Sequence, residues 1–364
     1  MSHATVSRFT PQNHPDRLLA LNNLLLDPLP KVFHPLGIAQ GRLDWQGRDV
    51  NLTITRGSSA GGTFTGSGRI SNLSPLNLEL ALDFPDLDLG AVFNLDKSKV
   101  DDPRPKNDTV QVGVNLHTDH LQYKTFVAEQ VRAFCYWHGR QADLRVTEAK
   151  TAGGTLNGDA TLWPDSKDLY LTPRVTGVDV SRTLSMLGTP SDKLTGTLNG
   201  EGKIHFPDWH EWHNLAQWRA QVSLAVADGV AQRIPVLVRL WSTVSLQELL
   251  SFQLPSLPSD DFAFSSLAGD FALGDGVAIT SNLTLTGKSV RIESAGKIDL
   301  ARHALDLKTS LMPLHGITSS VAKVPLAGEL LARGAEMLTT LPLHVYGPYN
   351  DPTVTPLVID LGRR

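Results

Sequence analysis

Alternating apolar and polar residues run through most of the chain, and this two-residue period predicts β-strands with one apolar face. Leu43 and Trp45 alternate with polar residues before the turn QGRD. The alternation resumes after the turn at Val50, Leu52 and Ile54. Short segments of this kind, joined by turns every 8–12 residues or so, are typical of an antiparallel β-meander. The pattern therefore predicts a mainly β protein.

One segment of the chain occurs twice. Residues 45–66, WQGRDVNLTITRGSSAGGTFTG, recur without gaps as residues 137–158, WHGRQADLRVTEAKTAGGTLNG. Both copies keep the tryptophan, the Gly-Arg turn, the Gly-Gly-Thr motif and the final glycine, and a partial third copy begins at Gly196. Glycine inside a strand commonly marks a bulge or a bend. We therefore expect the sheet to bend at the same point in both copies.

The C-terminal part of the chain continues the strand pattern, with glycine-rich or polar turns between segments. Apolar residues alternate with polar ones there at Val290 and Ile292, Ile298 and Leu300, and Leu305 and Leu307. The same meander is therefore expected to extend to the end of the chain.

Three segments break the strand rhythm and are predicted to be helical: 15–26, 232–252 and 315–341. The second is expected to start or kink near Pro235, because proline cannot donate the backbone hydrogen bond of a helix interior. The segment 100–108, VDDPRPKND, is rich in charge and proline and is the clearest linker.

These features divide the chain into three predicted regions. Residues 1–100 hold the N-terminal helix and the first β repeat, and residues 109–227 hold the second repeat. Residues 228–364 form a C-terminal β region with amphipathic helices.

The segment 315–341 is apolar and rich in small residues, and it admits two interpretations. It could cap an exposed apolar sheet, or it could lie in a membrane surface, since it is too broken to span a bilayer. The same two interpretations apply to 232–252. The residues expected to contact a membrane are Val324, Leu326, Leu330, Leu331, Met337 and Leu338.

The amino-acid composition of the chain excludes several classes of function. The chain is 41% hydrophobic and 19% charged, with a formal net charge of −4, so it has no basic field for nucleic acid. Its one cysteine, Cys135, excludes an internal disulfide and a cysteine metal cluster, and we expect it to be a small strand residue.

No motif in the sequence carries recognisable chemistry. His210 and His213 are three residues apart, but no full set of metal ligands accompanies them. Neither a nucleophile elbow nor a phosphate-binding loop is present, so we predict no catalytic residue, no metal and no cofactor. The aspartates that alternate with apolar residues are expected on the solvent face of the sheet: Asp86, Asp88, Asp179 and Asp299.

Three tryptophans lie close together in the sequence, at Trp209, Trp212 and Trp218. They could form a platform for a sugar, or they could pack in the fold or lie at a membrane interface. A carbohydrate-binding β-protein is therefore one alternative function.

The order of motifs after residue 227 resembles the AsmA-like family, which includes the YhdP- and TamB-type bridge-like lipid transfer proteins. The resemblance rests on ADGVAQRIPVLVRLWSTVSLQELLSF, on FAFSSLAGDFALGDG, on GKIDLARHALDL and on LHVYGPYNDPTVTPL. It spans the region from Asp228 to Leu357, and the N-terminal third fits more loosely through its Gly-Gly-Thr repeat.

The resemblance implies a long, curved antiparallel β-meander with an apolar groove. It also implies phospholipid transport between the inner and outer membranes of a diderm bacterium, with a role in outer-membrane integrity. The implied location is the periplasm, with anchoring to the inner membrane by an upstream segment that this chain lacks. The residues expected to line the groove are Leu52, Ile54, Leu144, Val146, Val290, Ile292, Ile298, Leu300, Leu305 and Leu307.

The expected partners are phospholipids, a bacterial membrane surface and other envelope proteins. An envelope scaffold that assists outer-membrane assembly by binding proteins along its sheet edge is a second alternative function.

Overall fold

The structure of the protein is a computed structural model. The residues that it describes are 17–26, 36–47, 49–73, 75–92, 111–163, 165–187, 193–211, 214–245, 261–314 and 340–357. The chain divides into two compact units. The first comprises residues 1–173 and 186–188, and the second comprises residues 174–185 and 189–364.

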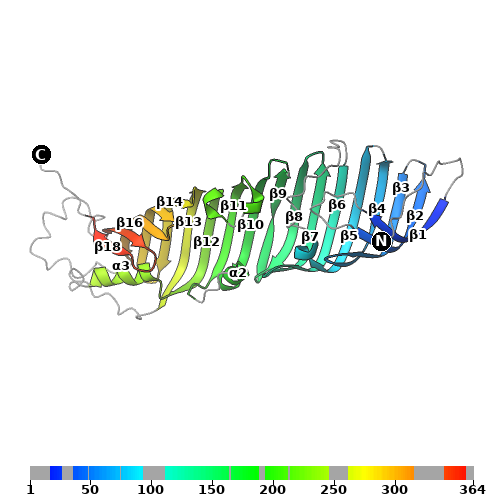
Figure 1. Ribbon diagram of the computed structural model, residues 1–364. Coiled ribbons are helices and arrows are strands. Elements are labelled where there is room, and N and C mark those ends of the chain that lie inside the picture. Colours follow the sequence, from blue (N-terminus) through cyan, green and yellow to red (C-terminus); the bar gives the residue numbers. More distant parts are fainter. Residues whose placement is uncertain are drawn as a thin grey trace, which may run out of the picture. The chain divides into compact units, whose positions relative to one another are not determined.

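The first unit is a sheet of long strands that follow one another in chain order (Figure 1). Neighbouring strands are antiparallel except β5 and β6, which are parallel. A parallel pair requires a crossover connection rather than a hairpin, so the meander is interrupted once in this unit. The elements are β1 (Arg17–Leu26), β2 (Leu36–Gln46), β3 (Asp49–Ser59), β4 (Gly62–Leu73), β5 (Leu76–Asp88), α1 (Leu89–Val92), β6 (Gln111–Tyr123), β7 (Phe126–His138), β8 (Gln141–Thr151) and β9 (Gly154–Trp163).

The second unit is also a meander, and its strands from β11 to β18 are all antiparallel. Strand β10 (Asp168–Asp179) gives its first residues to the first unit and the rest to the second. The other elements are α2 (Val180–Met186), β11 (Thr197–Phe206), η2 (Trp209–Glu211), η3 (Leu215–Gln217), β12 (Arg219–Gln232), α3 (Pro235–Ser245), β13 (Asp261–Gly274), β14 (Val277–Gly287), β15 (Val290–Asp299), β16 (Ala304–Pro313), β17 (Leu341–Pro348) and β18 (Thr353–Pro356). The predicted mainly β, antiparallel meander is therefore confirmed, with one parallel pair as the exception.

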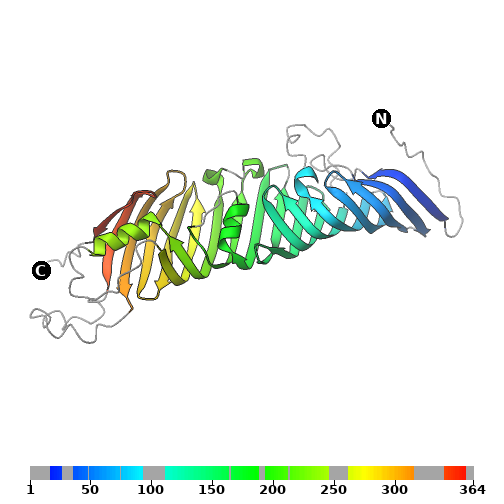
Figure 2. The ribbon, with the colours of Figure 1, turned by 90° about the horizontal axis from the view of Figure 1, so that it is seen from below.

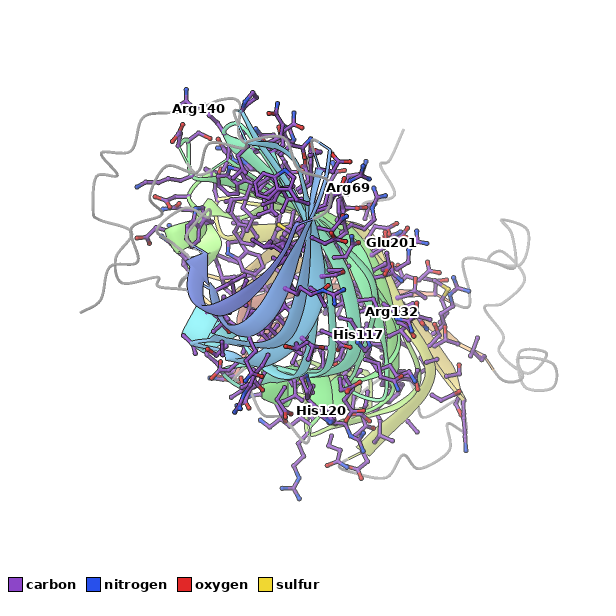
Figure 3. The ribbon with its side chains drawn as sticks, turned by 90° about the vertical axis from the view of Figure 1, so that its right-hand side faces the viewer. Arg69, His117, His120, Arg132, Arg140 and Glu201 are labelled. Carbon is purple, nitrogen blue, oxygen red and sulfur yellow. The ribbon has the colours of Figure 1, made fainter. Side chains whose placement is uncertain are left out.

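Each unit has an apolar inner face and a polar outer face. Burial alternates along the strands, as in β5, where Leu78, Leu80 and Leu82 are buried and the residues between them are exposed. Figure 3 shows the strands of the first unit bent into an arc, with Arg69 and Arg132 projecting from its convex side. The inner face is the concave one, so the bend brings apolar side chains of different strands together.

The two copies of the repeated segment have the same backbone arrangement. Each is the end of one strand, a tight turn, a complete strand, a second turn and the start of a third strand. In each copy, a β-bulge directly follows a pair formed by a β-branched residue and a glycine: Ile54 with Gly66, and Val146 with Gly158. The two copies thus share a β-bulge at the same point, and bulges increase the local bend and twist. The Gly-Gly-Thr motif from which a bend was expected lies instead at the turn that precedes the third strand.

The prediction of a helix at 15–26 is wrong, because β1 is a strand that pairs with β2 from Arg17 opposite Trp45 to Leu26 opposite Leu36. The leucine-rich run lacks glycine and proline, and leucine has a high helix propensity. Pairing with the open edge of β2 supplies every second backbone group with a partner and overrides that local preference.

The prediction of a helix within 232–252 is confirmed, and α3 begins at Pro235. Proline is favoured at the first position of a helix, where its missing N–H has no partner to lose. The predicted linker 100–108 lies outside the described residues. So does the predicted helix 315–341, except for Thr340, which is not helical, and Leu341, which begins β17.

Candidate functional site

The inner face of the first unit is closed over β3 to β6. Leu52 and Ile54 on β3 are each only 3% exposed, and the rings of Phe64 and Phe84 lie 5.0 Å apart beside them. These side chains belong to one hydrophobic cluster that continues through the inner residues of β5 and β6. This stretch is a packed core whose central side chains are buried.

The same inner face opens over β7 to β9. Leu144 on β8 is 38% exposed, although it alternates with polar residues and pairs with the inward Cys135 and Ala160. Val146 is partly buried at the edge of the hydrophobic cluster. Accessible apolar surface on the concave side of a sheet is the kind of surface that an apolar ligand can cover.

The inner face of the second unit also has a closed part and an open part. Helix α3 lies across the strands of this unit (Figure 2). Leu240 of α3 is buried in the cluster that contains Leu307 and Leu343, and Val236 packs against that cluster. The helix thus closes this part of the inner face, and Arg239 on it forms an ion pair of 2.5 Å with Asp351.

Away from α3, the inner face of the second unit is accessible. Leu224 on β12 is 40% exposed, and it pairs with the glycines Gly200 and Gly269 on the two neighbouring strands. Glycine has no side chain to cover a neighbour, so the Leu224 side chain remains open to solvent. Leu224 was not among the residues that the sequence singled out, and its glycine partners were the signal that could have identified it.

The residues expected to line a groove lie as follows. Within the first unit, Leu52, Ile54, Leu144 and Val146 share the inner face, but only the last two border the open stretch. The residues of the second unit that share its inner face are Val290, Ile292, Ile298, Leu305 and Leu307. Leu300 lies beyond β15, where its N–H donates to the carbonyl of Gly276 across a turn. The six residues expected to contact a membrane lie outside the described residues.

The aspartates expected on the solvent face differ in their roles. Asp88 accepts hydrogen bonds from the backbone N–H groups of Gly90 and Ala91 at the start of α1. Asp179 and Asp299 likewise accept from backbone N–H groups three residues later. Asp86 is exposed. The capping roles could have been recognised from aspartate placed just before a turn or a helix.

No part of the described chain holds a group of three or more histidine, cysteine, aspartate or glutamate side chains that could bind a metal ion. His213 and Trp212 lie outside the described residues. Cys135 is partly buried, and desolvation followed by the charge of Asp143 raises the pKa of its thiol. A raised pKa keeps the thiol protonated and therefore unreactive. Among the described helices, none is long and apolar enough to cross a membrane.

The second unit carries a shallow hollow of about 460 Å³ across β10 to β14, and its lining includes Leu224 and its two glycine partners as well as outer-face residues. Asp270 lies in it and accepts hydrogen bonds from the Ser223 hydroxyl at 2.5 Å and the Asn282 amide at 2.7 Å. These two hydrogen bonds lower the pKa of the Asp270 carboxyl. The hollow lies beside β-bulges in β13 and β14, which periodicity alone does not predict.

One known protein family matches the sequence of this chain. The family model described as "YhdP protein" matches residues 58–354, which is more than half of the chain. The chain belongs to the YhdP family. This is a YhdP/AsmA-type family of bridge-like lipid transfer proteins of the cell envelope, so the resemblance seen in the sequence is confirmed. Neither the comparison with curated proteins nor that with solved structures found a match.

Proposed function

We propose that this YhdP-family protein binds the acyl chains of phospholipids on the open stretches of its inner faces and supports phospholipid transport between the inner and outer membranes. The observation that carries the proposal is the accessible apolar surface around Leu144 in the first unit and Leu224 in the second. Family membership supports lipid as the class of ligand.

Acyl chains suit these surfaces energetically. Each CH₂ group removed from water contributes about 0.8 kcal/mol, so two chains provide a large binding term without polar recognition. Neighbouring positions along a strand-built surface are chemically alike, so a bound chain can shift between them without passing a strongly unfavourable state. We therefore propose that the protein acts as a non-enzymatic carrier or conduit in the periplasm.

The decisive experiment places a charge on the inner face. Leu144→Lys and Leu224→Lys each put an ammonium group where an acyl chain would lie, and each position is exposed enough to keep the fold. We expect each variant to bind several-fold less phospholipid, measured by mass spectrometry of co-purified lipids and by uptake of a fluorescent phospholipid from vesicles.

The matched controls lie on the outer faces of the same two units. Val127→Lys and Ile279→Lys change apolar residues that are 43% and 50% exposed and that alternate with buried neighbours. We expect these variants to load lipid normally. Equal loading by the inner-face and outer-face variants, or a protein that neither carries nor takes up phospholipid, would contradict the proposal. Retained binding of envelope proteins by lipid-free variants would instead favour the scaffold function.

A further inference from the structure

The outer face of the first unit carries a group of aromatic side chains that the lipid function does not use. Three of them follow one another at the two-residue period of β7: Phe134, Tyr136 and His138. Arg132, two residues before Phe134, projects from the convex side of the sheet in Figure 3. Trp163 on β9 and Tyr170 on β10 lie nearby in the same unit and complete the group, here called the aromatic patch.

The rings on β7 lie nearly parallel to one another. The ring centroids of Phe134 and Tyr136 are 6.3 Å apart with planes inclined by 11°, and those of Tyr136 and His138 are 5.1 Å apart at 30°. Trp163 and Tyr170 meet edge to face with centroids 5.4 Å apart. Phe134 is 39% exposed and Tyr170 is 45% exposed. The patch thus presents aromatic surface to solvent in a row along one strand.

A fixed set of polar groups borders the rings on β8 and β9. The Asp143 carboxylate accepts from the Gln141 amide at 2.9 Å and from the Thr161 hydroxyl at 2.8 Å. It also lies 3.0 Å from the imidazole of His138. Desolvation opposes the charged form, but the hydrogen bonds from these three groups together lower the pKa of Asp143. The network holds the ionised Asp143 carboxylate beside Tyr136, which is the residue that pairs with Asp143 across β7 and β8.

The charged side chains around the patch are paired with one another. Arg145 lies 2.6 Å from Asp159, and Arg140 pairs with Asp165. The charges within these pairs offset one another, and the ionised Asp143 disfavours an anionic ligand. A ligand that fits this surface is therefore uncharged and rich in hydroxyl groups, with apolar faces that can stack on the rings.

The fold does not require these rings. The first copy of the repeat has the same register on β2 and β3, where Arg42 pairs with Thr53 and Asp44 pairs with Asn51. In the second copy, Phe134 pairs with Arg145 and Tyr136 pairs with Asp143 at the corresponding positions. Since the same strand pair forms with polar side chains in one copy, the aromatic side chains of the other are free to serve binding.

From this arrangement we infer that the aromatic patch binds a neutral oligosaccharide chain. The C–H faces of successive pyranose rings stack on Phe134 and Tyr136, and their hydroxyl groups bond to Gln141, which the Asp143 network holds in place. A row of rings along a strand with polar groups on the next strand matches the alternating apolar and polar faces of a sugar chain. The patch lies on the outer face and is therefore distinct from the lipid surface on the inner face.

The test is titration of the full chain with two neutral probes, chitohexaose and cellohexaose, by isothermal titration calorimetry. The two probes differ in their acetamido groups and therefore separate two classes of sugar. We expect one or both to bind, and we expect the variant Phe134→Arg/Tyr136→Asp/Asp143→Asn to bind at least about tenfold more weakly. This variant carries the residues found at the corresponding positions 42, 44 and 51, and a thermal melt verifies that its sheet forms.

Two further variants test whether binding requires aromatic rings and whether it is specific to the aromatic patch. Phe134→Leu/Tyr136→Leu keeps apolar area but removes the ring faces, and we expect the same loss of binding. Tyr346→Ala removes an equally exposed tyrosine from the second unit, and we expect binding to be unchanged. The inference is overturned if neither probe binds, or if the leucine variant binds as well as the natural protein. Lipid loading should persist in all these variants, so this outcome is separate from the test of the lipid function.

Discussion

Leu52 and Leu144 occupy the same position in the two copies of the repeat, yet one is buried and the other is exposed. Each lies on the inner face, in the second strand of its copy, and pairs with a small residue on the next strand, Gly68 or Ala160. Leu52 is 3% exposed and Leu144 is 38% exposed. The same backbone therefore serves as core in one place and as candidate binding surface in the other.

The difference follows from the size of the neighbouring inner side chains. At three corresponding positions the second copy has the smaller residue: Ala142 in place of Val50, Val146 in place of Ile54, and Leu156 in place of Phe64. Smaller side chains fill less of the concave side of a sheet, so apolar surface remains uncovered. In a repeat protein, the volume of the inner residues thus decides which segments are closed and which are open.

The largest expected effect comes from truncating the buried member of this pair. Leu52→Ala removes a side chain from a packed cluster and should lower the free energy of unfolding by about 2–5 kcal/mol, as large-to-small core substitutions do. Leu144→Ala should lower it by less than about 1 kcal/mol, because part of that side chain is already in water. Urea denaturation followed by circular dichroism measures both values.

Equal losses in the two variants would mean that Leu144 is packed in solution and that the inner face over β8 is closed. The double variant provides a further check. Since the two leucines have no shared partners, their effects should add within about 0.5 kcal/mol.

A smaller loss of stability is expected when the last glycine of each copy, which both copies share, is replaced. The last glycine of each copy faces the next strand at short range, and a Cβ there would lie 2.3 Å from the Ala81 carbonyl oxygen at Gly66 and 2.5 Å from that of Thr172 at Gly158. Gly158 also has a φ of +151°, a conformation that residues with a side chain rarely adopt. Gly66→Ala and Gly158→Ala should each destabilise the protein by about 1–3 kcal/mol.

Thermal unfolding compares these glycine variants with Gly47→Ala, since a Cβ at Gly47 meets no atom within 4 Å. Gly47 has a φ of +64°, so its variant isolates the cost of backbone conformation from that of close approach. If all three variants lose the same stability, the close approach to the next strand is not what selects glycine at the ends of the copies.

The sequence predicted the strands and the repeat well because both rest on periodicity, which is a local property. The helix predicted at 15–26 is a strand because its leucine-rich run can form either structure, and pairing with the open edge of β2 stabilises the strand. Periodicity also does not show whether a residue on the inner face is buried or exposed. The inner residues beside Leu52 are larger than those beside Leu144, and the cluster that covers Leu52 also includes Phe84 on β5.

The smallest expected effect concerns the outer faces of the two copies, where Asp143 stands at the position of Asn51. The folded state lowers the pKa of Asp143 below its ordinary value of 3.8, so its ionised form stabilises the protein above that pH. The contribution is lost as the pH falls through the lowered pKa. Asp143→Asn should therefore cost about 0.2–1 kcal/mol at neutral pH, the range measured for exposed pairs, and the difference from the natural protein should vanish in stronger acid. Chemical denaturation at neutral pH and at successive values below 3.8 measures this convergence. A gap that stays constant with pH would show that the amide changes packing rather than charge, and that the copies differ at this position in shape alone.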